Sequence, residues 1–249
     1  MAYDPQIVRT KFIPPLPRKR LLIRARLAEL LGGVVSHRVT ILQAGPGYGK
    51  STVLAVHLSR AGVPSFWYSV NSADTDPRVF ITHLIWSLRA AYPTVGSESL
   101  SLLEENYGPA ARRQAVDLLS NDLLDQIIGD VAIVIDDYHA VAKSPEVSEI
   151  VENLINTMPP HVHLILSTRE RPSFGSLARW RVRGEALEIT EKDLAFTASE
   201  ISGLFSGPYQ HELTAAQVKV VQERTEGWII ALEMIWHALR EGLSLPELF

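Results

Sequence analysis

The sequence predicts an α/β protein in which a mostly parallel sheet lies between layers of helices and is followed by a small helical subdomain. Compact apolar runs alternate with helical patterns between residues 38 and 190. A glycine-rich stretch joins the first of these runs to a helical pattern, and after about Ala195 the patterns are helical throughout. Strands that alternate with helices and are apolar on both faces are typical of a parallel sheet covered by helices.

The composition is that of a folded protein with a sizeable core. The 249 residues are 46% hydrophobic, which is enough for one large domain or two unequal ones. The formal net charge of -4 gives no overall attraction to nucleic acid or to an anionic membrane. The absence of cysteine excludes a disulfide framework and a thiol nucleophile. The N-terminal stretch lacks the apolar run of a signal peptide, and no run is long enough to span a bilayer, so we expect a cytoplasmic protein.

The chain begins with an expected lead-in, residues 1–19, which carries four prolines and is predicted to be extended over the body of the protein rather than helical. Leucines at helical spacing predict a helix within residues 20–33, where a pair of glycines ends it. The β-branched run RVTILQA predicts a buried strand at 38–44. The run KSTVLAVHLSRAG predicts a helix over 50–62 that ends at its glycine.

The middle of the chain repeats this alternation. PSFWYSVN predicts a strand at 64–71, and DPRVFITHLIWSLRAAY places four apolar residues on one face of a helix over 76–92. Residues 94–109 are rich in serine, glycine and glutamate and predict a loop or a short helix. The amphipathic run ARRQAVDLLSNDLLDQII predicts a helix at 111–128, and the apolar run DVAIVIDD predicts a buried strand at 130–137.

The last strands precede a change of pattern. A helix is predicted at 145–158, with strands at 161–169 and 185–190 on either side of the arginine-rich stretch RWRVRGE, which is expected to be a solvated face. Three helical patterns then follow one another, and Thr197 and Thr214 stand near the starts of two of them as capping residues. The expected parts are a lead-in, an α/β domain and a helical subdomain, at 1–19, 20–195 and 196–249.

The stretch AGPGYGKS, residues 44–51, fits the phosphate-binding P-loop pattern, with alanine in the first glycine position. It lies between a predicted strand and a predicted helix, as this loop requires. Its backbone can curl around a β-phosphate, and the N-terminus of the following helix adds its dipole. The residues expected to form this cradle are Gly45, Pro46, Gly47, Tyr48 and Gly49.

Three side chains after the glycines complete the predicted nucleotide site. Lys50 supplies a positive charge for the β- and γ-phosphates, and the Ser51 hydroxyl is a suitable oxygen ligand for Mg²⁺. Thr52 can reach the α-phosphate. The alternative for the whole stretch is a simple tight turn, which need not lie between a buried strand and an amphipathic helix.

Two further strand ends carry candidate groups. Asp136 and Asp137 end an apolar strand at the sheet edge where ligands bind, so Asp136 is predicted to hold the magnesium shell, the Walker B role, and Asp137 to orient or activate water. A solvated strand end with a turn cap is the alternative. Arg169 ends another strand and can meet a γ-phosphate, unless it forms a surface salt bridge. Asp74 and Asp76 favour turn chemistry over a nucleotide contact.

These motifs, in this order, resemble the STAND class of signal-transduction ATPases, in particular the nucleotide-binding module of MalT-like and large ATP-binding LuxR-type regulators. The stretches that carry the resemblance are TKFIPPLPRKRLLIRARL, GPGYGKST, WYSVNSADTDPRVFITHLI, VIDDYHAV, LILSTRERP and LEITEKDLAFTASEI. The resemblance implies a slow ATPase switch with Mg²⁺, ADP-bound at rest and self-associating with ATP. It further implies that Ile23 and Arg24 lie near the adenine or ribose and that Arg169 senses the γ-phosphate. EGWIIALEM resembles an adenine-contacting motif, with Ile229 in place of its proline.

The family usually continues into a winged-helix domain, a helical-repeat sensor and a C-terminal helix-turn-helix. The hypothesis from this resemblance is that the chain is the N-terminal part of a longer, signal-responsive transcriptional regulator, which meets DNA only through C-terminal domains absent from this sequence. We therefore expect a regulatory ATPase switch module. Two alternatives remain open: an interaction module that binds nucleotide without significant hydrolysis, and a small-molecule P-loop kinase.

Overall fold

The computed structural model describes residues 7–16, 20–106 and 108–248. The described residues form a five-stranded sheet in the order β2-β3-β4-β1-β5, and every pair of neighbouring strands is parallel. The strand ends that carry predicted site residues are all carboxyl ends, so they lie at the same edge of the sheet. The strands are β1 (Val39–Gln43), β2 (Ser65–Ser69), β3 (Val131–Asp136), β4 (Val162–Thr168) and β5 (Ala186–Thr190).

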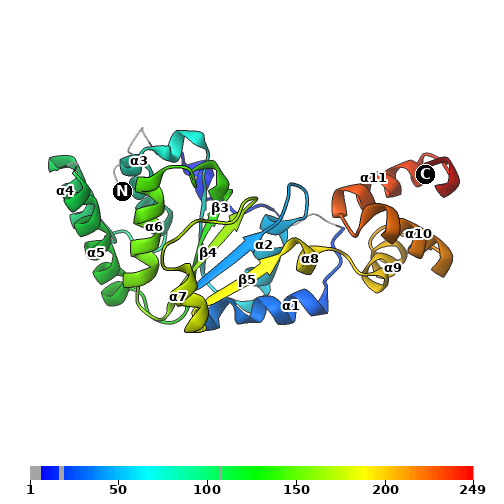
Figure 1. Ribbon diagram of the computed structural model, residues 1–249, viewed down its shortest axis with the longest axis horizontal. Coiled ribbons are helices and arrows are strands. Elements are labelled where there is room, and N and C mark those ends of the chain that lie inside the picture. The colour runs from blue at the N-terminus through cyan, green and yellow to red at the C-terminus, as the bar shows by residue number, and fades with distance from the viewer. Residues whose placement is uncertain (1–6, 17–19, 107, 249) are drawn as a thin grey trace.

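Helices connect and follow these strands (Figure 1). The helices up to β5 are α1 (Ala25–Gly32), α2 (Lys50–Ala61), α3 (Pro77–Leu88), α4 (Ser97–Glu105), α5 (Pro109–Gln126), α6 (Pro145–Thr157) and α7 (Leu177–Val182). Those after it are α8 (Glu191–Leu194), α9 (Ala198–Ser206), α10 (Ala215–Thr225), α11 (Ile229–Arg240) and α12 (Leu245–Leu248). Short 3-10 turns are η1 (Arg9–Phe12), η2 (Gly33–Ser36), η3 (Ser72–Thr75) and η4 (Tyr138–Ala140). No helix of the described part of the chain is long and apolar enough to cross a membrane.

Alternate residues of each strand face opposite layers of helices. In β3, Ile133 belongs to the core shared with α3, α5 and α6, whereas Val134 belongs to the core shared with α1 and α2. Asp136 follows Val134 by two residues, so the two-residue period of a strand places it on the α2 side of the sheet. The three-layer arrangement thus brings the end of β3 and the start of α2 to the same place.

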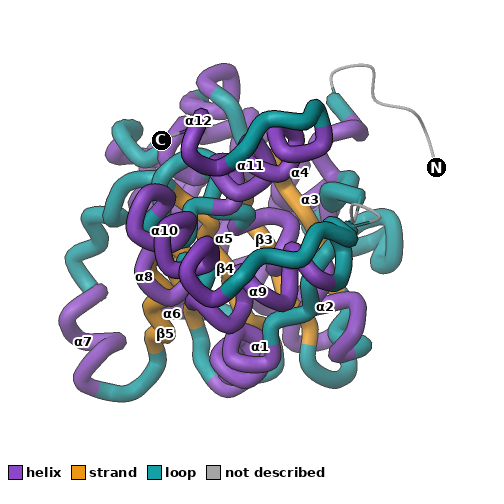
Figure 2. Tube along the Cα trace, turned by 90° about the vertical axis from the view of Figure 1, so that its right-hand side faces the viewer, coloured by secondary structure: helices purple, strands orange, loops and turns teal. Residues whose placement is uncertain are grey.

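A third hydrophobic cluster holds the helical subdomain together. It is built from residues of α9 to α12, among them Phe205 and Trp236, and Leu22 packs against it from the segment before α1. Figure 1 shows α9, α10 and α11 gathered beyond the ends of the strands, and Figure 2 shows them in front of the sheet. The subdomain therefore faces the sheet edge at which the predicted site residues end.

The predicted fold class is confirmed, and each predicted strand is present. Two helices of the α/β part were not predicted, α7 and α8. Helix α7 overlaps the arginine-rich stretch at 179–185, which the sequence predicts as a solvated face, and it is anchored by Trp180, whose side chain is fully buried. The division at residue 195 stays a prediction.

At the start of the chain, one expectation is wrong and one predicted helix is shorter than its leucine pattern. Residues 9–12 form a 3-10 turn, not an extended strand, because none of the prolines falls within them and Lys11 N can donate to Val8 O at 3.1 Å. The turn is fixed by an ion pair from Lys11 Nζ to Asp74 Oδ1 at 2.6 Å, and the Asp74 side chain is fully buried. The rest of the lead-in prediction, for residues 1–6 and 17–19, lies outside the described residues. The first helix begins only at Ala25, after an irregular segment at 20–24.

Candidate functional site

The phosphate loop joins β1, an interior strand of the sheet, to α2. Gly47 and Gly49 have φ angles of 78° and 76°, a backbone conformation that glycine adopts at little cost. The backbone N–H of Ala44 donates to Thr168 O at 3.2 Å, which ties the start of the loop to the end of β4. The sequence folds locally into a tight loop because glycines stand where the backbone is left-handed.

Lys50 lies inside this loop. Its side chain is almost fully buried, and Nζ donates hydrogen bonds to the carbonyl oxygens of Ala44 at 2.9 Å and Gly45 at 3.0 Å. An ammonium has three donors, so these two bonds to described residues leave one for a ligand in the loop. Burial lowers the pKa of Lys50, and the charges of Asp137 and Asp136 act in the opposite direction.

The start of α2 fits a phosphate group. Its N-cap is Gly49, which offers no side chain to the first-turn N–H groups of the helix. Such N–H groups need a partner, and an anion can supply it together with a favourable interaction with the helix dipole. Ser51 and Thr52, in the first turn, are half-buried and line the adjoining cavity.

Asp136 and Asp137 are consecutive but have different surroundings. Asp136 is buried at the end of β3, and Oδ1 accepts a hydrogen bond from Asp137 N at 3.1 Å. Asp137 has a φ of 58°, a left-handed conformation that aspartate tolerates better than most residues, and its side chain is 52% exposed. One carboxylate thus faces α2 from inside the protein, and the other stands at the cavity.

The residues around Asp136 fit a hydrated divalent ion that also binds phosphate oxygens. Ser167 follows Leu166, the register partner of Ile135, so it lies beside Asp136, and its buried Oγ has no hydrogen-bond partner among the described residues. The described part of the chain has no group of three or more His, Asp or Glu side chains able to hold a metal on its own. Mg²⁺ is commonly bound by one or two protein ligands together with water and phosphate, and Ser51 and Asp136 would be those ligands here.

Arg169 stands directly after β4 and is exposed toward the same cavity. Burial lowers the pKa of His139, and the positive charge of Arg169 lowers it further, which places the guanidinium near the turn after β3. His139 Nδ1 lies 3.8 Å from Asp137 Oδ1, too far for a hydrogen bond. A cation and a carboxylate thus flank the mouth of the phosphate loop.

A cavity of about 340 Å³ connects these groups to the helical subdomain. Of the predicted site residues it brings together Ile23, Arg24, Asp137, Arg169 and the run from Pro46 to Thr52, whereas Gly45 and Asp136 are not among its lining residues. Apolar and aromatic side chains of the helical subdomain complete the lining: Leu204, Tyr209 and Phe196, none of which was a predicted site residue, and Ile229 and Ile230, which belong to the stretch EGWIIALEM and lie against the glycines of the loop. A polar region beside a phosphate loop and a largely apolar remainder suit a nucleotide.

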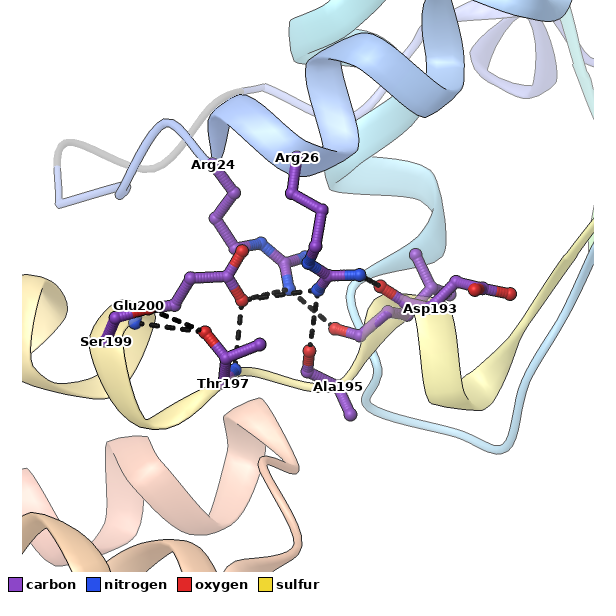
Figure 3. A network of polar contacts seen from close by, with 8 residues as sticks. Arg24, Arg26, Asp193, Ala195, Thr197, Ser199 and Glu200 are labelled. Atoms are coloured by element: carbon purple, nitrogen blue, oxygen red, sulfur yellow. Dashed lines mark hydrogen bonds and ion pairs between the residues drawn. The ribbon is translucent and has the colours of Figure 1, made fainter.

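The guanidinium of Arg24 is turned toward the linker between α8 and α9 rather than held free for a ligand (Figure 3). Its Nη1 donates to Leu194 O at 2.6 Å, and its Cζ lies 4.1 Å from the centre of the Phe196 ring. Burial lowers the pKa of Arg24 to about 10, and the nearby Glu200 partly offsets this. The predicted contact of Arg24 with adenine or ribose stays a prediction, and in this structure only the placement of the residue at the cavity supports it.

The helical subdomain touches the phosphate loop directly. The indole Nε1 of Trp228 donates to Pro46 O at 3.0 Å. A Cβ on Gly47 would lie only 2.2 Å from Cδ1 of Ile230 and 2.9 Å from Trp228 Nε1. The first residues of α11 therefore pack on the loop at the point where it has no side chain.

Two known proteins are similar in sequence to nearly the whole of this chain. The serine/threonine-protein kinase PknK of Mycobacterium tuberculosis is 30% identical over 245 residues, which are 96% of this chain and 21% of that protein. The HTH-type transcriptional regulator MalT of Cronobacter sakazakii is 28% identical over 243 residues, 95% of this chain and 26% of that protein. The chain thus spans about a fifth to a quarter of the length of these relatives. No family model matches the chain.

A solved structure shows a similar fold. The STAND protein with a tetratricopeptide repeat sensor from Pyrococcus horikoshii superposes with a TM-score of 0.58 at 15% identity, over 90% of this chain and 31% of that one. The fold is that of a P-loop NTPase with an attached helical subdomain. The chain is similar in sequence to regions of PknK and MalT.

Proposed function

We propose that this module is a regulatory switch that binds ATP or ADP with Mg²⁺ and hydrolyses ATP slowly to ADP and phosphate. The observation that carries the proposal is the cradle around Lys50: a left-handed glycine loop, a buried ammonium with a donor left over and an uncapped helix start converge on one point. An anion is the ligand these groups favour. The largely apolar remainder of the cavity supports a base as the other part of that ligand.

Hydrolysis needs a positioned water and a stabilised γ-phosphate. Asp137 stands at the cavity with a half-exposed carboxylate, so it is placed to hold a water and accept its proton as the water oxygen attacks phosphorus. Arg169, on the neighbouring strand end, would balance the charge on the γ-phosphate oxygens. Bound Mg²⁺ would supply charge neutralisation, with Ser51 and Asp136 as its protein ligands.

The switch is proposed to act through the helical subdomain. The loop that would hold phosphate is in contact with Trp228 and Ile230, and the cavity wall is shared between the two parts of the chain. A phosphate group in the loop therefore changes the surroundings of α11 directly. We further propose that the module belongs to a longer transcriptional regulator, as in MalT, that it self-associates with ATP bound, and that it acts in the cytoplasm.

The test compares two variants of the phosphate site with a matched control. Lys50→Ala should weaken the binding of ATP and ADP at least about 30-fold, because it removes a buried charge that pairs with phosphate. Asp137→Asn should keep the dissociation constants within about threefold and slow phosphate release about 100-fold. Lys219→Ala, at an exposed lysine of α10, should change neither. Isothermal titration calorimetry and a phosphate-release assay measure these effects.

Each outcome separates one alternative. Absence of nucleotide binding by the wild-type chain, with no nucleotide extracted from the purified protein, would overturn the proposal as a whole. If wild type and Asp137→Asn both bind nucleotide and neither hydrolyses it, the chain is an interaction module, and Asp137 has no catalytic role. Phosphate transfer to a small-molecule hydroxyl instead of water would identify a kinase.

A further inference from the structure

The carboxylate of Glu191 lies against the phosphate loop, although this residue follows the last strand of the sheet. Glu191 is the first residue of α8, and its Oε2 accepts a hydrogen bond from the backbone N–H of Gly45 at 3.1 Å. A Cβ on Gly45 would lie 3.3 Å from the same oxygen and 3.7 Å from Cε2 of Tyr48. The protein thus places a negative charge of its own on a loop whose other features favour anions.

The charge of Glu191 affects the pKa of two side chains of the loop. Burial, followed by the Glu191 carboxylate, raises the pKa of the Tyr48 hydroxyl to about 12. Glu191 is also one of the acidic groups that raise the pKa of Lys50 against the larger effect of burial. A further negative charge in the loop, such as a phosphate group, would therefore meet repulsion from Glu191 as well as attraction from Lys50.

We propose that Glu191 is an internal anion that weakens nucleotide binding, and weakens the binding of a triphosphate more than that of a diphosphate. The inference rests on the proposed function, since it concerns the affinity of the same site. Repulsion grows with the charge of the ligand, and ATP carries one more negative charge than ADP with or without one bound Mg²⁺. Glu191 therefore biases the site toward the diphosphate without contact with the base.

The central experiment is Glu191→Gln, which keeps the size and an acceptor oxygen for Gly45 N but removes the charge. We expect tighter binding of both nucleotides and a rise of about threefold in the ratio of ATP affinity to ADP affinity, equal to about 0.7 kcal/mol. The effect is modest because Glu191 is exposed and water screens its charge. Calorimetric titration of wild type and variant with each nucleotide, at the same Mg²⁺ concentration, measures the ratio.

Two controls separate charge from loop geometry. Glu105→Gln makes the same change in net charge on α4, at the end of the molecule opposite the helical subdomain, and should leave the ratio unchanged (Figure 1). The difference between wild type and Glu191→Gln should shrink as the salt concentration rises from about 0.05 M to about 0.5 M, because salt screens exposed charges. If Glu191 only holds the loop in shape, Glu191→Gln will behave as wild type and Glu191→Ala will weaken both nucleotides equally.

The results also distinguish this inference from the proposed function. A wild-type chain that binds both nucleotides, with the same affinity ratio in Glu191→Gln, would overturn the role of Glu191 and leave the nucleotide site standing. Lack of binding by the wild type would overturn both. Should Glu191→Gln fold poorly in thermal unfolding, Glu191→Ala still decides, because removal of the charge should raise the ratio of ATP affinity to ADP affinity, whereas a role in loop shape alone should weaken both nucleotides equally.

Discussion

Gly47 and Gly49 share a left-handed backbone but have different neighbours. Alanine at either position would bring a similar backbone penalty of about 1 kcal/mol, since their φ angles differ by only 2°. A Cβ on Gly47 would meet Cδ1 of Ile230 at 2.2 Å, whereas on Gly49 the nearest atom would be Cγ2 of Ile229 at 3.9 Å. The absence of a side chain at Gly47 therefore serves the contact with α11 as well as the shape of the loop.

This difference gives a prediction at the residue scale. In the nucleotide-free protein, Gly47→Ala should lower the free energy of unfolding by about 1–3 kcal/mol more than Gly49→Ala does, because overpacking adds to the backbone penalty. Urea unfolding of the two variants measures the difference. Adding Ile230→Ala to Gly47→Ala removes the two nearest atoms and leaves Trp228 Nε1 at 2.9 Å, so it should recover part of the difference. Equal losses in the two single variants would mean that the loop does not touch α11 in solution.

Individual site residues were predictable where their chemistry is local in sequence. The phosphate loop is one continuous stretch between a strand and a helix, and the two aspartates follow an apolar run, so both could be predicted without a fold. Trp228 and Pro46 are 182 positions apart, and Glu191 and Gly45 are 146 apart. No pattern in a single sequence reports such pairs, because they depend on how the helical subdomain folds back onto the sheet edge.

At the scale of elements, the end of α8 and the linker to α9 are held by arginine side chains at the start of α1. Arg26 donates to Asp193 O at 2.8 Å and Ala195 O at 3.0 Å, and it lies 3.3 Å from the Glu200 carboxylate (Figure 3). Arg24 holds the same linker from the side of the cavity. The start of α1 thus fixes the segment that connects the sheet to the helical subdomain.

We expect Arg26→Ala to loosen this linker. The loss should be about 1 kcal/mol of local stability, because two carbonyl oxygens lose a charged donor in a partly exposed setting. The amides of Thr197 and Glu200 close the capping box of α9. A loss of this size should make hydrogen exchange at both amides several-fold faster. Arg113→Ala is the control, since its ion pair with Glu149 is exposed on both sides and should matter little. Unchanged exchange at both amides in Arg26→Ala would contradict this role of the linker.

The elements themselves were predictable to different degrees. The strands β1 to β4 are short apolar runs with clear ends and are largely buried on both faces, so sequence pattern and structure agree. The edge strand β5 has only Ile189 fully buried. The segment at 20–24 has the leucines of a helix but is irregular, because Leu22 packs on the helical subdomain and Arg24 is held by Leu194 O. Tertiary contacts there override the helical pattern. The short helix α7 was missed because its single buried tryptophan is surrounded by arginines.

At the scale of the whole molecule, two partly buried histidines connect stability to pH. Burial is the main cause that lowers the pKa of His57 in α2 and of His139 after β3 below 6.5. A histidine with a lowered pKa in the folded state binds protons more readily in the unfolded chain. Its contribution to stability is therefore complete above pH 6.5 and is lost as the pH falls through 6.5 toward the lowered folded values.

The expected outcome is a loss of stability in mild acid that depends on these two side chains. Urea unfolding at about pH 7.5 and about pH 5.5 should show a smaller loss for the double variant His57→Gln, His139→Gln than for wild type. His211→Gln, at a histidine between α9 and α10, serves as a matched substitution. An equal loss in wild type and the double variant would assign the acid sensitivity to other groups.

The buried pair of Lys11 and Asp74 has a practical consequence for anyone who wishes to fuse this module to another protein. Because the N-terminal stretch is rich in proline, a shortened gene could be designed to start at α1. Such a cut would remove Lys11, the cation that pairs with the buried carboxylate of Asp74, and loss of one partner of a buried ion pair costs roughly 3–5 kcal/mol. That is a large fraction of the roughly 5–15 kcal/mol that keeps a domain folded. A transplant should therefore keep the chain from Ile7 onward.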